Sequence, residues 1–108
     1  MKINITTKNI TLDAPLTVFI EQKMGGLEKL IHKSTATVLV EVGKPSKRHK
    51  SGPIFYAEAN LKIDGKLLRA EATHADLRTA IDKVRDELHI QIKKFKERKK
   101  DFSRKPKK

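Results

Sequence analysis

Residues 54–73 constrain the fold more than any other part of the chain, because apolar and polar side chains alternate there on both sides of Asp64-Gly65. A period of two residues is that of a β-strand with one buried face, and Asp-Gly is a strong signal for a tight hairpin turn. The sequence therefore predicts two antiparallel strands, 54–63 and 66–73. The expected inward residues are Phe55, Ala57, Ala59, Leu61, Ile63, Leu68, Ala70 and Ala72.

Two more strands and two helices are predicted elsewhere. Residues 2–7 and 35–42 alternate in the same way. A helix should start at Asp13, whose side chain can cap backbone N–H groups, and continue to Ile31 with a bend at Gly25-Gly26. A second helix is expected from about residue 76 to 100, with Asp76 as its cap and Thr73 at capping-box spacing. Its core stripe is Leu77, Ile81, Val84, Leu88, Ile92 and Phe95.

This element order, β-α-β-β-β-α, predicts an α+β fold with a four-stranded mixed sheet and two helices packed on one face. The first crossover makes the first two strands parallel, and the short loops make the later pairs antiparallel. The other sheet face should be polar. We expect one domain over residues 1–100 and a basic, disordered tail over residues 101–108.

The charge of the chain points to a polyanionic partner. The net charge is +12, and residues 76–108 carry 13 Lys and Arg against 6 Asp and Glu. Nucleic acid and an anionic membrane surface both attract such a segment. The absence of cysteine excludes disulfides and cysteine-based zinc sites. With no signal peptide and no long apolar run, a cytoplasmic protein is expected.

The cations of the second predicted helix gather on one stripe, beside the core stripe. A helical wheel places these residues within it: Arg78, Asp82, Arg85, His89, Lys93, Lys96 and Lys100. The far side of the helix mixes both signs, as a solvated face does. Lys23 of the first helix, with Lys29 or Lys33, would flank the stripe. This pattern favours a groove that contacts phosphates, although a solvated helix face is the alternative.

Other candidate residues carry weaker signals. Residues 43–53 form a basic loop in which Lys44, Lys47, Arg48 and Lys50 are possible secondary RNA contacts, and Arg104 to Lys108 could add nonspecific attraction. Asp82 is expected to pair with Arg78 or Arg85. The four histidines have no metal-binding spacing and no Gly-rich phosphate loop is present, so we expect no enzyme, no cofactor, no metal and no small-molecule substrate.

The start of the second helix, Asp76-Leu77-Arg78-Thr79-Ala80-Ile81-Asp82, resembles a signature of the ribosome hibernation promoting factor and protein Y family. In that family the signature reads Asp-hydrophobic-Tyr-Ala-Ala-Ile-Asp. Leu88 and the run from Gln91 to Lys96 are similar to the family's helix end, and Ile3 to Thr6 and Lys23 with Leu27 also fit. The resemblance spans about residues 1–100. The family is also labelled sigma-54 modulation protein.

The resemblance implies a fold similar in shape to a double-stranded RNA-binding domain. It implies binding to 16S rRNA of the 30S subunit and the 70S ribosome, in the channel for messenger and transfer RNA. Translation would be blocked under stress or in stationary phase. Lys23, Lys93, Lys94 and Lys96 carry over by motif match as rRNA contacts, and the wheel adds Arg78, Arg85, His89 and Lys100.

This sequence departs from the family pattern at several positions. Arg78 replaces Tyr, Thr79 replaces Ala, and Ile90 stands where many members have Arg, which leaves an exposed apolar residue. The dimerisation domain of the long family form has no counterpart in these residues. We therefore expect a monomer off the ribosome that does not pair 70S particles by itself.

Two other functions fit the same residues. A transcription modulator would contact a protein through the polar sheet face or Ile90, and a general nucleic-acid binder would not prefer the ribosome.

Overall fold

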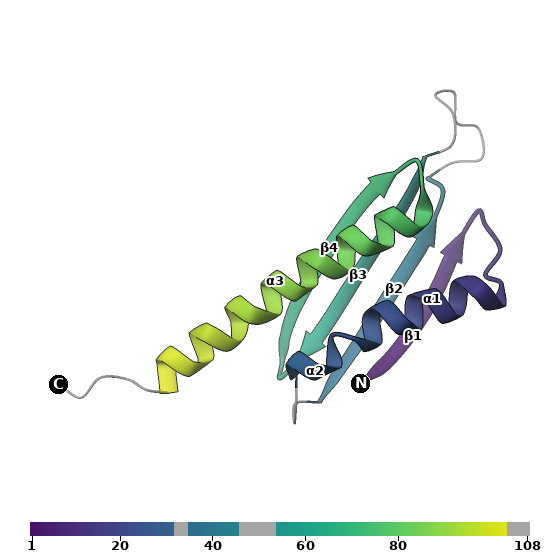
Figure 1. Ribbon diagram of the computed structural model, residues 1–108. Helices are drawn as coiled ribbons and strands as arrows, with labels where there is room; N and C mark the ends of the chain where they lie inside the picture. Colours follow the sequence, from purple (N-terminus) through teal and green to yellow (C-terminus); the bar gives the residue numbers. More distant parts are fainter. Residues whose placement is uncertain (32–34, 46–53, 104–108) are drawn as a thin grey trace.

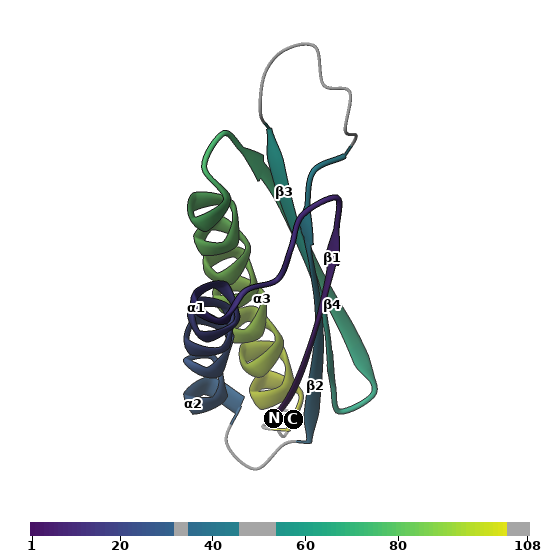
Figure 2. The same ribbon diagram turned by 90° about the vertical axis from the view of Figure 1, so that its right-hand side faces the viewer.

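The computed structural model describes residues 1–31, 35–45 and 54–103, and only the helical backbone of residues 99–103. Its elements form two layers, with the helices covering one face of a single sheet (Figures 1 and 2). In chain order they are β1 (Lys2–Lys8), α1 (Ala14–Gly25), α2 (Glu28–Ile31), β2 (Ala36–Gly43), β3 (Phe55–Ile63), β4 (Lys66–His74) and α3 (Leu77–Ser103).

The sheet has the predicted mixed topology, with strand order β1-β2-β3-β4. β1 runs parallel to β2, whereas β2 and β3, and β3 and β4, are antiparallel. Asp64 and Gly65 both adopt positive φ, of 49° and 80°, at the turn between β3 and β4. Two successive positive φ values characterise the tight turns that match the twist of a hairpin. The predicted hairpin is therefore confirmed.

The core lies between the sheet and the helices, and no polar or charged residue is buried among the described residues. Val38, Ala59 and Leu61 of the sheet and Val84 and Leu88 of α3 are fully buried, as the alternation and the helical stripe predicted. Met24 of α1 is also fully buried. α3 packs mainly on β4 and β3, so its position is set by the sheet.

The predicted first helix is interrupted where its two glycines lie. Asp13 caps α1, because its Oδ1 accepts from the Leu16 backbone N–H at 2.9 Å. α1 ends at Gly25 and α2 begins at Glu28, with Leu27 buried between them. A bend in one continuous helix was expected, but the helix breaks here instead, because glycine has a low helix propensity and the helix gains little from continuing through two of them.

The start and end of α3 differ from the prediction in two details. Thr73 belongs to β4, so the capping-box pairing of Thr73 with Asp76 is wrong. Asp76 caps α3 alone, and its Oδ2 accepts from Thr79 N at 3.1 Å and Thr79 Oγ1 at 2.6 Å. Residues 101–103 are helical rather than part of a tail, since the sequence has no glycine or proline between residues 77 and 105. Residues 104–108 lie outside the described residues.

The Asp76 cap should make stability depend on pH. Hydrogen bonds from the Thr79 hydroxyl and backbone N–H, with the charges of His74 and Arg78, hold the pKa of Asp76 below its usual range. The cap therefore stabilises the fold above the ordinary Asp pKa of about 3.9, and its contribution is lost as the pH falls through the lower folded value. Urea unfolding of wild type and Asp76→Ala should differ at pH 7, and the difference should shrink as the pH falls below the ordinary Asp pKa of about 3.9. A difference independent of pH would contradict this role.

Candidate nucleic-acid interface

The α1–α3 edge, defined by Phe19 and Lys23 of α1 and Arg78 and Asp82 of α3, is where the two long helices meet. Lys23 Nζ lies 3.0 Å from Asp82 Oδ1, across the two helices. The prediction that Asp82 pairs with Arg78 or Arg85 is therefore wrong. The contact is electrostatic rather than a directed hydrogen bond, because Asp82 Oδ1 has no hydrogen-bond partner among the described residues. Asp82 thus fixes one cation of the edge.

The ring of Phe19 carries two cations. The Arg78 guanidinium carbon lies over the ring at 4.6 Å from its centroid, and Lys23 Nζ lies 5.4 Å from the same centroid. A cation over an aromatic face is attracted by the negative potential of the ring. Phe19 is partly buried and also packs against the core. Its spacing of four residues from Lys23, one helical turn, is the sequence signal for their contact.

The remaining candidates on α3 are spread along the helix. Arg85 Nη2 pairs with Asp86 Oδ1 at 3.2 Å. His89 and Lys96 are half-buried, and Lys93 and Lys94 are exposed. The side chain of Lys100 lies outside the described residues. The last turns of α3 project beyond the ends of the strands (Figure 1). The cations toward that end are therefore open to a large partner.

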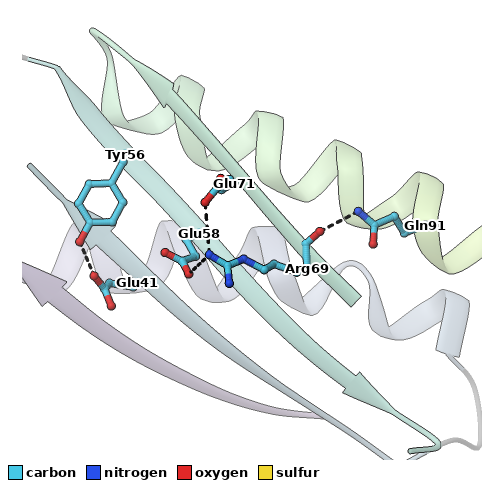
Figure 3. Close-up of polar contacts among 6 residues, drawn as sticks. All are labelled: Glu41, Tyr56, Glu58, Arg69, Glu71 and Gln91. Carbon is cyan, nitrogen blue, oxygen red and sulfur yellow. Dashed lines mark hydrogen bonds and ion pairs between the residues drawn. The ribbon is translucent and has the colours of Figure 1, made fainter. Parts of the chain in front are cut away.

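Gln91 ties α3 to the edge of the sheet. Its Nε2 donates to the backbone oxygen of Arg69 on β4 at 2.8 Å (Figure 3). The same Nε2 donates to Glu87 Oε2 at 3.0 Å. This polar contact adds to the apolar packing of α3 on β4. Gln91 thus holds α3 against β4, and the Lys23–Asp82 contact holds it against α1. Together these contacts fix the direction in which the cations of α3 point.

Of the secondary candidates, Lys44 directly follows β2. Lys44 Nζ lies 5.5 Å from the centroid of Phe55, and the Lys44 backbone N–H donates to Lys8 O at 3.0 Å. Lys47, Arg48 and Lys50 fall outside the described residues, as does Lys33. Lys29 lies on α2 and is exposed. Of this group only Lys44 and Lys29 can be placed, and neither lies among the residues that define the α1–α3 edge.

The uncovered sheet face is mostly polar, as predicted, with Leu39 and Leu67 as exposed apolar exceptions, and it carries a row of glutamates. Glu41 lies opposite Glu58, and Glu58 lies opposite Glu71. Like charges directly opposite are unfavourable, and Arg69 offsets them through contacts of 2.8 Å to Glu58 and 3.4 Å to Glu71 (Figure 3). This row opposes the approach of a phosphate backbone, whereas the helices on the other side of the molecule present cations.

Tyr56 stabilises the carboxylate at one end of this row by a hydrogen bond, without carrying a charge itself. Its hydroxyl donates to Glu41 Oε2 in a short hydrogen bond (Figure 3). Burial, followed by the hydrogen bond to Glu41, raises the pKa of Tyr56 to about 12. The phenol therefore stays protonated and keeps donating at neutral pH.

Within the described parts of the chain, no group of three or more potential metal ligands comes together. Among the described helices, none combines the length and the apolar character that a bilayer crossing requires. Ile90 of α3 is 48% exposed, which confirms the expected exposed apolar side chain.

Comparisons with known proteins confirm the resemblance seen in the sequence. A ribosome hibernation promotion factor of Deinococcus radiodurans is 30% identical over 95 residues, which cover 87% of this chain and 48% of that protein. The chain thus spans about half the length of that relative. A ribosome hibernation promoting factor of Pseudomonas putida is 31% identical over 99 residues, covering 91% of this chain and 89% of that protein.

A solved structure shares the fold. The N-terminal domain of Thermus thermophilus Protein Y is 26% identical, with a TM-score of 0.76, and the match covers 88% of this chain and 99% of that one. The model of the family described as "Sigma 54 modulation protein / S30EA ribosomal protein" matches residues 3–100. Because this match includes the sheet and the helices, the chain belongs to the sigma 54 modulation protein / S30EA ribosomal protein family.

Proposed function

We propose that this protein is a ribosome-associated translation inhibitor that binds 16S rRNA through the helical side of the molecule. The observation that carries the proposal is the separation of charge. Cations of two helices meet at the α1–α3 edge, where Lys23 and Arg78 share the ring of Phe19. The aligned glutamates occupy the uncovered sheet face on the other side. An RNA backbone is attracted to the first surface and repelled by the second.

The relatives support the choice of the ribosome as the RNA partner, since two of them are ribosome hibernation factors. In this proposal the protein occupies the channel of messenger and transfer RNA in the 30S subunit, alone or within the 70S ribosome, and is a monomer when unbound. Lys23, Arg78, Arg85, His89, Lys93, Lys94, Lys96 and Lys100 contact the rRNA. Phosphate contacts supply affinity and position the protein but read little sequence. The protein acts by occupancy under stress or in stationary phase, not by catalysis.

Sedimentation tests the proposal directly. Lysate from stationary-phase cells that express the chain is separated on a sucrose gradient at low salt, and the protein is followed by immunoblot. We expect it in the 30S and 70S fractions, with release as salt rises, because each phosphate contact adds roughly 0.7–0.9 to the slope of log affinity against log salt. Protein that stays at the top of the gradient at low salt would refute the proposal. An excess of arbitrary duplex RNA that displaces it fully would favour a general RNA binder.

A protein-binding role in transcription is the second candidate, because the family description includes sigma 54 modulation and Ile90 is exposed on α3. Affinity capture after nuclease treatment distinguishes the ribosome-binding role from the transcription role. The ribosome proposal predicts loss of the captured material, and the transcription role predicts a retained protein partner that is lost in Ile90→Arg.

A further inference from the structure

We propose that Arg78, laid over the ring of Phe19, is a stacking platform for an unpaired RNA base at the α1–α3 edge. This inference rests on the proposed function and deepens it, because it assigns a base contact to a surface otherwise expected to bind phosphates.

The first step is the geometry of the Phe19–Arg78 pair. The guanidinium carbon lies over the ring, 4.6 Å from its centroid. Phe19 is partly buried and packs against the core, so the ring is held by α1. The ring therefore lies against one side of the guanidinium group, while Arg78 itself is exposed. The side of the group that faces away from the ring is accessible to a partner.

The second step is that Arg78 forms no direct ion pair among the described residues, although its charge influences Asp76 at longer range. Lys23, on the same ring, is held by Asp82, and Arg85 is held by Asp86. Arg78 takes part in no ion pair with a carboxylate within the described parts of the chain. Of the three cations, it is the one whose N–H donors and outer face remain available to a partner that approaches this edge.

The third step is the chemistry of the partner. A guanidinium is weakly hydrated and flat, so a nucleobase can stack on it and continue the series of ring, guanidinium and base. Its edge donors can still reach a phosphate or a base oxygen. Bases in a duplex have their faces covered by their neighbours, so the platform selects a nucleotide in a loop, a bulge or a single strand. A lysine in the same place would keep the charge but could not stack.

The test uses substitutions that preserve charge. Arg78→Lys keeps the charge and removes the plane, and Phe19→Leu keeps an apolar side chain and removes the ring. Arg98→Lys is the matched control, since Arg98 is an exposed arginine of α3 with no recorded ring contact. The probes are a 12-nucleotide single-stranded RNA that contains one 2-aminopurine and a 12-base-pair RNA duplex. Circular dichroism and thermal melts establish that each variant is folded.

We expect Arg78→Lys and Phe19→Leu to bind the single strand about tenfold more weakly, with the salt slope unchanged and duplex binding unaltered. Wild type and Arg98→Lys should quench the 2-aminopurine fluorescence, and the two platform variants should not. Binding and quenching by Arg78→Lys equal to those of wild type would overturn the inference and leave Arg78 as a phosphate contact. Failure of wild type to sediment with ribosomes would instead overturn the proposed function, whatever these probes report.

Discussion

Replacement of Lys93, Lys94 and Lys96 by Glu in one variant is expected to abolish association with the ribosome while the protein stays folded. Lys93 and Lys94 are exposed and Lys96 is half-buried. None of the three takes part in an ion pair within the described residues, so the fold loses no recorded contact. The variant replaces attraction to phosphates by repulsion at three points toward the projecting end of α3.

The size of the effect follows from counterion release. Loss of three phosphate contacts removes roughly 2–3 units from the salt slope, and together with the added repulsion this lowers affinity by at least about 100-fold near physiological salt. In the gradient, the variant should remain at the top at salt concentrations where wild type sediments with 30S and 70S particles. Its melting temperature should lie within a few degrees of wild type, because surface substitutions change stability by roughly 0.5 kcal/mol or less.

A matched control separates position from net charge. Lys2, Lys62 and Lys66 are exposed residues of β1, β3 and β4, and none takes part in a recorded ion pair. Their replacement by Glu lowers the net charge from +12 to +6, as does the α3 variant. We expect this control to keep most of its association with ribosomes. Equal loss in both variants would show that binding depends on total charge and would contradict the proposed helical interface.

The fold could be predicted in most of its detail because its signals are local. Alternation identified the inward face of each strand, and Asp64-Gly65 identified a turn that fixes the register of β3 and β4. The same reasoning predicts only one of the two pairs in the row of glutamates. The hairpin turn places Glu58 opposite Glu71. The pairing of Glu41 with Glu58 depends on the register of β2 and β3, which a long loop leaves undetermined.

In the candidate interface, too, contacts between separate elements could not be predicted from local sequence patterns. A helical wheel places Asp82 among the cations of its own helix, and its neighbours Arg78 and Arg85 are the local candidates for pairing. The actual partner, Lys23, comes from α1, and the axial position of one helix relative to another is set by packing on the sheet. For the same reason the contact of Arg78 with Phe19 could not be derived from either helix alone.

Gly43→Ala should strongly destabilise the protein. Gly43 ends β2 and pairs with Lys8 of β1. An added Cβ would lie 2.0 Å from Lys8 O and 2.9 Å from Lys8 C and N, and these are backbone atoms that cannot rotate away. The end of β1 must therefore move, which also breaks the hydrogen bond from Lys44 N to Lys8 O.

We expect Gly43→Ala to lower the free energy of unfolding by about 3 kcal/mol, from overpacking and the loss of one backbone hydrogen bond. For a domain of this size that corresponds to a fall of about 12 °C or more in melting temperature. Gly25→Ala is the control, because its Cβ would meet nothing within 4 Å. There, alanine lowers the entropy of the unfolded chain and favours α1, so stability should be unchanged or rise by up to about 1 kcal/mol. Urea unfolding of both variants, with hydrogen exchange at the Lys44 amide, tests the pair. A Gly43→Ala variant as stable as Gly25→Ala, with its Lys44 amide still protected, would show that the strand ends are not in close contact.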